Sequence, residues 1–169
     1  AGEATKHLAK TKNVGYLRIE KTGVELPRDA NEVFEIGRSR RIFDGNDLTL
    51  VATGGLMSEA YKARDVLAEQ GVECRLISMH SIKPFDNKEI LSAAQETNGI
   101  LTIEEHNELG GLYSTVCEEL MKNDCQPISV KSIAIRDEFC TVVGDQDYLR
   151  AHYKLNSESI VRSALDMVK

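Results

Sequence analysis

The sequence predicts an α/β fold, a three-layer sandwich with a mostly parallel sheet of about five strands. From residue 47 onward, short apolar runs alternate with segments of helical periodicity, and residues typical of helix caps stand between them. Strands that alternate with helices of this length indicate βαβ units, with helices on both faces of the sheet. The core must be aliphatic, since the 169 residues include no Trp and only 5% are aromatic.

The first 46 residues lack this alternation. Residues 3–10 have helical periodicity, and the run 14–20 is rich in β-forming residues. Residues 21–37 carry Gly, Pro, Asp and Asn with little periodicity, which is typical of a connector. The helical piece begins without a cap or an initiator Met, so we expect the sequence to start inside a larger protein.

Capping residues mark the helices that follow. Ser58, Asp86 and Asn156 are expected to cap three of them, and Gly71 and Gly99 are expected to end two. Apolar runs between the helices predict the strands. The expected strands are 47–55, 72–79, 100–105 and 128–135, and the expected helices are 57–71, 85–99, 110–123, 145–154 and 156–168.

Charge and cysteine content argue against several classes of protein. The net charge of −6 speaks against nucleic-acid binding, and we interpret the basic run RSRR at 38–41 as solvated surface. No pair of cysteines has CxxC spacing, so we expect free, mostly buried thiols in a cytoplasmic protein. No apolar run approaches the length of a transmembrane helix and no signal peptide opens the chain, so we expect no membrane contact.

Polar residues gather at the predicted carboxyl ends of the strands, where open α/β sheets bind ligands. Three loops meet at this edge: ATGGLMS at 52–58, MHSIKPF at 79–85 and EEHNELGG at 104–111. A helix N-terminus follows each loop and favours anions. The candidates for a crevice at this edge are Thr53, Gly54, His80, Glu104 and His106.

Two of these loops have alternative interpretations. His106 beside Glu104 or Glu105 could be an oriented general base, although no Ser or Cys nucleophile is recognisable beside it. Alternatively, a carboxylate of this loop caps the following helix. The glycines of 53–55 could cradle a phosphate, but the absence of a GxGxxG pattern favours a tight strand-to-helix turn.

The combination of motifs resembles the transketolase family. The blocks TLVATGGLMSEAYKARDVLAEQG, IKPFD and GILTIEEHNELGGLYSTVCEEL are similar to the C-terminal domain of transketolases, especially the short form encoded as two subunits. The ending VGDQDYLRAHYKLNSESIV resembles the end of the family, and EATKHLAKTKNVGYLRIEKTG resembles the last helix and strand of the preceding pyrimidine-binding domain. The resemblance implies the tail of that domain at 1–24, a connector at 25–46 and the transketolase C-terminal domain at 47–169.

The resemblance also implies a function. Transketolases use thiamine diphosphate and a divalent metal such as magnesium to move a ketol unit from a ketose phosphate to an aldose phosphate. The cofactor-binding residues belong to domains upstream of this chain. We therefore expect the isolated chain to hold no cofactor or metal, to contain no catalytic residue and to be inactive. Its role would be scaffold and dimerisation in a homodimer, together with the N-terminal domains or subunit.

Two cations in the first β-rich run are candidates for contact with a substrate phosphate. In the family an Arg at the end of this strand contacts the sugar phosphate; Lys21 matches that position, and Arg18 matches a second common Arg. Lys offers a point charge and not a bidentate fork, so this departure puts phosphate binding in question. A solvated pair of charges is the alternative.

Other interpretations of the chain share or replace this function. The same fold occurs in deoxyxylulose-phosphate synthases and in the beta subunits of 2-oxoacid dehydrogenases, but those relatives usually replace the His of EEHNELGG. A stand-alone dimerisation module is a second alternative. A flavodoxin-like nucleotide-binding protein is a third, which the missing phosphate fingerprint disfavours.

Overall fold

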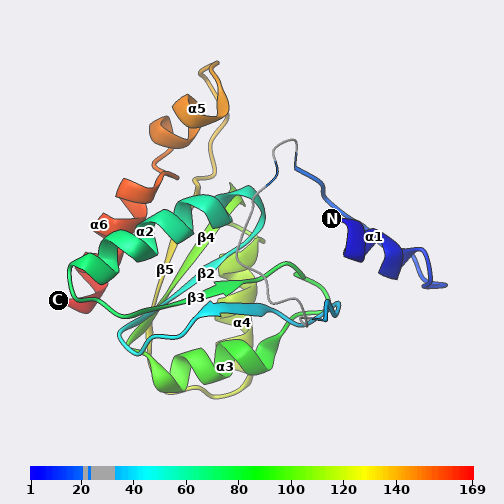
Figure 1. Ribbon diagram of the computed structural model, residues 1–169, viewed down its shortest axis with the longest axis horizontal. Coiled ribbons are helices and arrows are strands. Elements are labelled where there is room, and N and C mark those ends of the chain that lie inside the picture. Colours follow the sequence, from blue (N-terminus) through cyan, green and yellow to red (C-terminus); the bar gives the residue numbers. More distant parts are fainter. Residues whose placement is uncertain (21–22, 24–32) are drawn as a thin grey trace.

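A five-stranded sheet forms the centre of the computed structural model, which describes residues 1–20, 23 and 33–169 (Figure 1). The strand order is β1-β3-β2-β4-β5. Strand β1 runs antiparallel to β3, and all other neighbours are parallel. The predicted mostly parallel sheet of about five strands is therefore confirmed. The strands are β1 Arg40–Phe43, β2 Leu48–Ala52, β3 Cys74–Ser78, β4 Gly99–Asn107 and β5 Ser129–Ile135.

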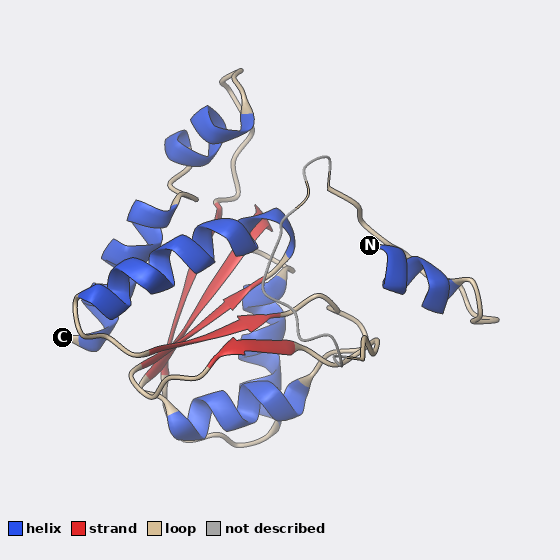
Figure 2. Cartoon of the chain, in the orientation of Figure 1, coloured by secondary structure: helices blue, strands red, loops and turns tan. Residues whose placement is uncertain are grey.

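Helices cover both faces of the sheet, which gives the three predicted layers (Figure 2). Helices α2 and α6 pack on one face, and α3 and α4 pack on the other. Helices α5 and α1 lie outside these layers (Figure 1). The helices are α1 Gly2–Leu8, α2 Met57–Glu69, α3 Asn87–Glu96, α4 Leu112–Lys122, α5 Gln146–His152 and α6 Ser157–Val168, and a short 3-10 turn, Gly54–Leu56, precedes α2.

The register of the central strands explains the aliphatic core. Leu50 lies opposite Leu76 on one side and Leu101 on the other, and all three side chains are fully buried under α2 and α6. Val51, the next residue along β2, points to the opposite face and packs below α3 and α4. Burial of each such side chain contributes about 1.5–3 kcal/mol. Both faces of β2 are covered, so four of its five residues are apolar and all five are buried.

The capping predictions are confirmed for two helices and wrong for a third. The Asp86 side chain accepts from a backbone N–H in the first turn of α3, and Asn156 does the same for α6. Helix α2 begins one residue before Ser58, so Ser58 lies inside the helix. Its hydroxyl donates to the carbonyl of Gly55 at 3.0 Å.

The two predicted stop residues also differ. Gly71 follows α2 with a φ of +78°, a conformation that glycine adopts without strain, so this prediction is confirmed. Gly99 does not end α3, because that helix stops at Glu96 and Gly99 already begins β4. The prediction for Gly99 was therefore wrong.

The N-terminal part differs from the prediction in two ways. Residues 14–20 have no regular secondary structure and pair with no strand in the part of the chain that the structure describes, so the strand predicted from their composition is absent. Conversely, β1 lies within the range 25–46 that was expected to be a connector. Its Ile42 and Phe43 pack against the core on the α2 side, so the sheet starts before residue 47.

The described residues contain neither a membrane-spanning helix nor a metal-binding cluster. None of the helices found there has the length and apolar content needed to span a bilayer. Within the same ranges, no group of three or more His, Cys, Asp and Glu side chains is arranged to hold a metal ion.

Candidate functional site

The predicted crevice residues lie where expected, at the carboxyl edge of the sheet. Thr53 and Gly54 follow β2, His80 follows β3, and Glu104 and His106 belong to the last part of β4. The ends of β2 and β4 are joined directly, since the N–H of Thr53 donates to the carbonyl of Ile103 at 3.1 Å. The five candidates nevertheless have separate partners and do not converge on one point.

Glu104 binds the N-terminus of α4. Its side chain is only 2% exposed, and its two carboxylate oxygens accept from the N–H groups of Leu112 and Tyr113 at 2.7 and 2.9 Å. These N–H groups have no partner within the helix, and the positive end of the helix dipole favours the negative charge. A Cβ on Gly111 would overlap with Glu104 Oε2, so the close approach requires glycine there. The geometry is that of a helix cap.

His106 is not oriented by either neighbouring carboxylate. It is exposed, and its Nδ1 lies 2.9 Å from the carbonyl oxygen of Asn107. Glu104 binds α4, and Glu105, the next residue along the strand, binds a partner on α5. The arrangement needed for an oriented general base is therefore not formed.

Arg150 is the residue at this edge that sequence reasoning missed. It lies on α5, is only 7% exposed, and donates from Nε and Nη2 to Glu105 Oε2 at 3.1 and 2.9 Å. The pair is 45 residues apart in sequence, so no local spacing predicts it. Arg18, a predicted phosphate contact, also reaches this point, where its Nη1 donates to the carbonyl of Glu105 at 3.2 Å. Lys21 lies outside the described residues.

The glycine turn after β2 is filled by the protein itself. Gly54 has a φ of +63°, and a Cβ on either Gly54 or Gly55 would overlap with a carboxylate oxygen of Glu20. A phosphate placed in this turn would meet a negative charge. The described residues of this turn therefore do not fit the diphosphate of thiamine diphosphate.

His80 lies on a separate, open part of the edge. Its Nδ1 is 2.9 Å from Ser81 Oγ, and its ring packs against Phe34 with the centroids 4.7 Å apart. The two rings line an open pocket of about 230 Å³ beside the basic run 38–41. The predicted crevice is thus divided into a closed part at β2 and β4 and an open part at β3.

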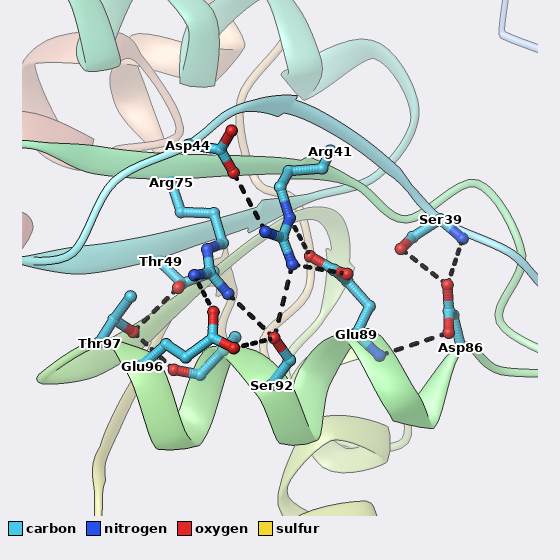
Figure 3. Close-up of polar contacts among 11 residues, drawn as sticks. Ser39, Arg41, Asp44, Thr49, Arg75, Asp86, Glu89, Ser92, Glu96 and Thr97 are labelled. Atoms are coloured by element: carbon cyan, nitrogen blue, oxygen red, sulfur yellow. Dashed lines mark hydrogen bonds and ion pairs between the residues drawn. The ribbon is translucent and has the colours of Figure 1, made fainter. Parts of the chain in front are cut away.

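Residues 38–41 are exposed or half-buried, in agreement with their interpretation as surface, and Ser39 and Arg41 are in addition bound to α3 (Figure 3). Arg41 donates to both carboxylate oxygens of Glu89, at 2.8 and 3.0 Å. The N–H and hydroxyl of Ser39 donate to Asp86 Oδ2 at 2.8 and 3.0 Å. These bonds attach β1 to the first turn of α3.

A buried arginine lies in the same layer. Arg75, on β3, is 2% exposed and forms an ion pair with Glu96, whose side chain is half exposed (Figure 3). The Nε of Arg75 is buried without a hydrogen-bond partner in the described part of the chain. This pair links β3 to the end of α3.

A buried carboxylate also meets the N-terminus of α6. Glu59 accepts from Lys62 Nζ at 2.7 Å and from the N–H of Ser157 at 2.9 Å. Burial acts to raise the pKa of Glu59, but these two hydrogen bonds and the charges of Lys62 and Arg150 outweigh it, so the pKa is lowered.

Comparison with known proteins identifies the family. A model of the transketolase C-terminal domain matches residues 37–160, which include every strand of the sheet and most of its helices. The chain belongs to the transketolase C-terminal domain family. The match begins before β1, in agreement with the place of that strand in the sheet.

Curated relatives of this transketolase domain are subunits and sections of larger enzymes. The chain is 39% identical over 155 residues to one subunit of the apulose-4-phosphate transketolase of Phocaeicola vulgatus, covering 91% of this chain and 48% of that protein. It is 32% identical to the 6-deoxy-6-sulfo-D-fructose transketolase subunit SqwH of Clostridium sp. strain MSTE9, covering 91% and 47%. It is also 34% identical to the 1-deoxy-D-xylulose-5-phosphate synthase of Halothermothrix orenii, covering 92% and 24%. The chain thus spans about half the length of these transketolase subunits.

A solved structure agrees with this assignment. The chain is similar to a split-gene transketolase in an inactive β4 tetramer, with a TM-score of 0.89 and 29% identity over 98% of this chain and 54% of that one. The resemblance to the two-subunit type of transketolase is therefore confirmed.

Proposed function

We propose that this chain is the C-terminal part of a transketolase that transfers a ketol unit from a ketose phosphate to an aldose phosphate. In this proposal, thiamine diphosphate and a divalent metal bind to parts of the enzyme outside the chain. The chain supplies scaffold, contacts with the N-terminal domains or subunit, and contacts within a homodimer. Its similarity to the transketolase subunit of Phocaeicola vulgatus over 91% of its length supports this assignment.

The contacts of Glu104 and Glu105 at the sheet edge support the proposed scaffold role. A general base must reach a substrate proton, directly or through one water. Glu104 instead binds two helix N–H groups, and Glu105 binds a buried guanidinium. Both carboxylates stabilise the fold at the edge where ligands commonly bind, which agrees with chemistry carried out in other domains.

A reconstitution assay tests the proposal. The purified chain is incubated with thiamine diphosphate, magnesium, a ketose phosphate donor and an aldose phosphate acceptor, and product is measured by mass spectrometry. The same assay is run on the natural protein that contains this chain, together with the subunit that carries the diphosphate-binding domain. We expect turnover only in the second case, and sustained turnover by the chain alone would overturn the proposal.

The synthase relative favours a second candidate function. The chain is 34% identical to the 1-deoxy-D-xylulose-5-phosphate synthase of Halothermothrix orenii. In the reconstituted enzyme, formation of 1-deoxy-D-xylulose 5-phosphate without ketol transfer between sugar phosphates would favour this function. The two products differ in mass, so one experiment distinguishes them.

We expect Arg18 to contact a substrate phosphate in the full enzyme. Its side chain is 54% exposed, and one nitrogen is bound to the carbonyl of Glu105, which leaves other donors of the guanidinium for a ligand. In the reconstituted enzyme, Arg18→Met is expected to raise KM for sugar phosphates more than it lowers kcat. An unchanged KM would remove Arg18 from the phosphate site.

A further inference from the structure

Segment 14–20 contacts the sheet edge through charged side chains. Val14, Tyr16 and Ile19 are exposed, with 65% or more of each side chain accessible. The two charged residues instead reach the carboxyl edge, where Arg18 binds the carbonyl of Glu105 and the carboxylate of Glu20 lies in the glycine turn. These two charged contacts therefore hold the segment at this edge.

The Glu20 carboxylate requires the two glycines. Its oxygens occupy the positions that a Cβ on Gly54 or Gly55 would need. The guanidinium of Arg150 also approaches Gly55, with Nη2 only 2.7 Å from the position of such a Cβ. Even one methyl group at Gly55 would therefore displace a charged side chain.

The charges around the turn alternate in sign. Arg18 Nη2 lies 3.9 Å from Glu20 Oε1, and Arg150 Nη2 lies 2.9 Å from Glu105 Oε2. Two cations and two anions thus compensate one another at an edge where Arg150 is nearly buried. Such a set is held by its mutual attraction, and the exposed members are weakened by salt.

We propose that the carboxyl edge between β2 and β4 is a docking joint for the chain's own segment 14–20, with Glu20 seated in the Gly54–Gly55 turn and Arg18 bound at Glu105. The joint fixes the direction in which the segment leaves the domain. The joint itself does not depend on the proposed transketolase function.

Limited trypsin cleavage of the whole 169-residue chain tests the joint. Trypsin must take the Arg18 side chain into its specificity pocket, so cleavage after Arg18 requires its contact with Glu105 to open. Cleavage after Lys12, which is exposed in the same chain, is an internal reference. The measured quantity is the ratio of the two initial cleavage rates, obtained by mass spectrometry and divided by the same ratio for a synthetic peptide of residues 10–23.

The decisive variants are Gly55→Ala, which adds a methyl group where Glu20 lies, and Glu20→Gln, which removes the charge. We expect each to raise the normalised ratio about fivefold, because cleavage tracks the open population, and 1 M NaCl to raise it in the wild type. Ser58→Ala is the matched control, since it alters the same turn without filling the space of Glu20. The melting temperature of each variant confirms that it is folded.

Two results would overturn the proposal. One is a normalised ratio near one in the wild type, which would show that the segment is not held. The other is an unchanged ratio in Glu20→Gln, which lies outside the core and should fold even if Gly55→Ala does not.

Discussion

The two hydrogen bonds from α4 to Glu104 make a prediction about stability. Glu104→Gln keeps the size of the side chain but removes its charge. The amide oxygen can accept from Leu112 or from Tyr113, and the amide NH2 then faces the other N–H group as a second donor. Because the site is only 2% exposed, water cannot replace the lost partner.

The size of the effect follows from these contacts. A hydrogen bond to a charged group contributes about 1.5–3 kcal/mol, and a charge at a helix N-terminus contributes about 0.3–1 kcal/mol. We therefore expect Glu104→Gln to lower the free energy of unfolding by about 2–4 kcal/mol. For a domain of this size, each kcal/mol corresponds to a fall of about 2–4 °C in Tm.

Urea denaturation followed by circular dichroism measures this loss. Glu108→Gln is the matched control, because Glu108 lies in the same loop and only its backbone takes part in the described hydrogen bonds. A change below about 0.5 kcal/mol for Glu104→Gln, the size expected of a surface substitution, would refute the capping role. If Glu104→Gln abolished the activity of the reconstituted enzyme without lowering its stability, this result would favour the general-base interpretation.

Three further predictions concern buried groups. The pKa of Glu59 is lowered in the folded state, so its contribution to stability is present above the unfolded pKa of about 4.3 and is lost as pH falls through the folded pKa. The difference in free energy of unfolding between wild type and Glu59→Gln should therefore shrink below a pH of about 4.3. A difference that grows there would contradict this. Burial raises the pKa of the Cys74 thiol to about 12, whereas Cys140 is exposed. Iodoacetamide should therefore label Cys140 in the native protein and Cys74 only after unfolding. Rapid labelling of Cys74 in the native protein would refute its burial. Arg75→Met should change the free energy of unfolding by less than about 1 kcal/mol, because the variant removes a buried Nε that has no hydrogen-bond partner in the described part of the chain, while water can solvate the half-exposed Glu96. A loss above about 3 kcal/mol in urea denaturation would show that the ion pair stabilises the fold.

The fold was predictable because its signals are local. Strands β2 and β3 are buried on both faces and are mostly apolar, with Thr49, Arg75 and Ser78 as the polar members. Asp86 and Asn156 mark helix starts with their own side chains. Strand β1 could not be recognised, since two of its four residues are arginine and its pairing with β3 is a tertiary contact. The run 14–20 shows the converse, because β propensity without a partner strand does not produce a strand.

The site was predictable in position but not in role. Adjacent residues of a strand point to opposite faces, so Glu104 shares a face with Ile100 under α4, and Glu105 shares a face with Ile103. The sequence shows two neighbouring carboxylates, but their separate roles depend on which helix covers each face. Arg150 could not be paired with Glu105 from sequence, because the contact joins α5 to β4 across 45 residues.

The carboxylates at this edge and around it suggest why a ligand-prone position serves as scaffold. In ligand-binding α/β sheets, helix N–H groups at the carboxyl edge are available to anions. Here the N-termini of α3, α4 and α6 already bind Asp86, Glu104 and Glu59, and Glu20 fills the turn before α2. An anionic ligand at any of these points would have to displace a carboxylate of the chain and leave it without its hydrogen bonds or in contact with like charge. The chain's own carboxylates thus satisfy at this edge the groups that bind substrates or cofactors in other α/β proteins, which agrees with the proposal that ketol transfer takes place in the domains that this chain supports.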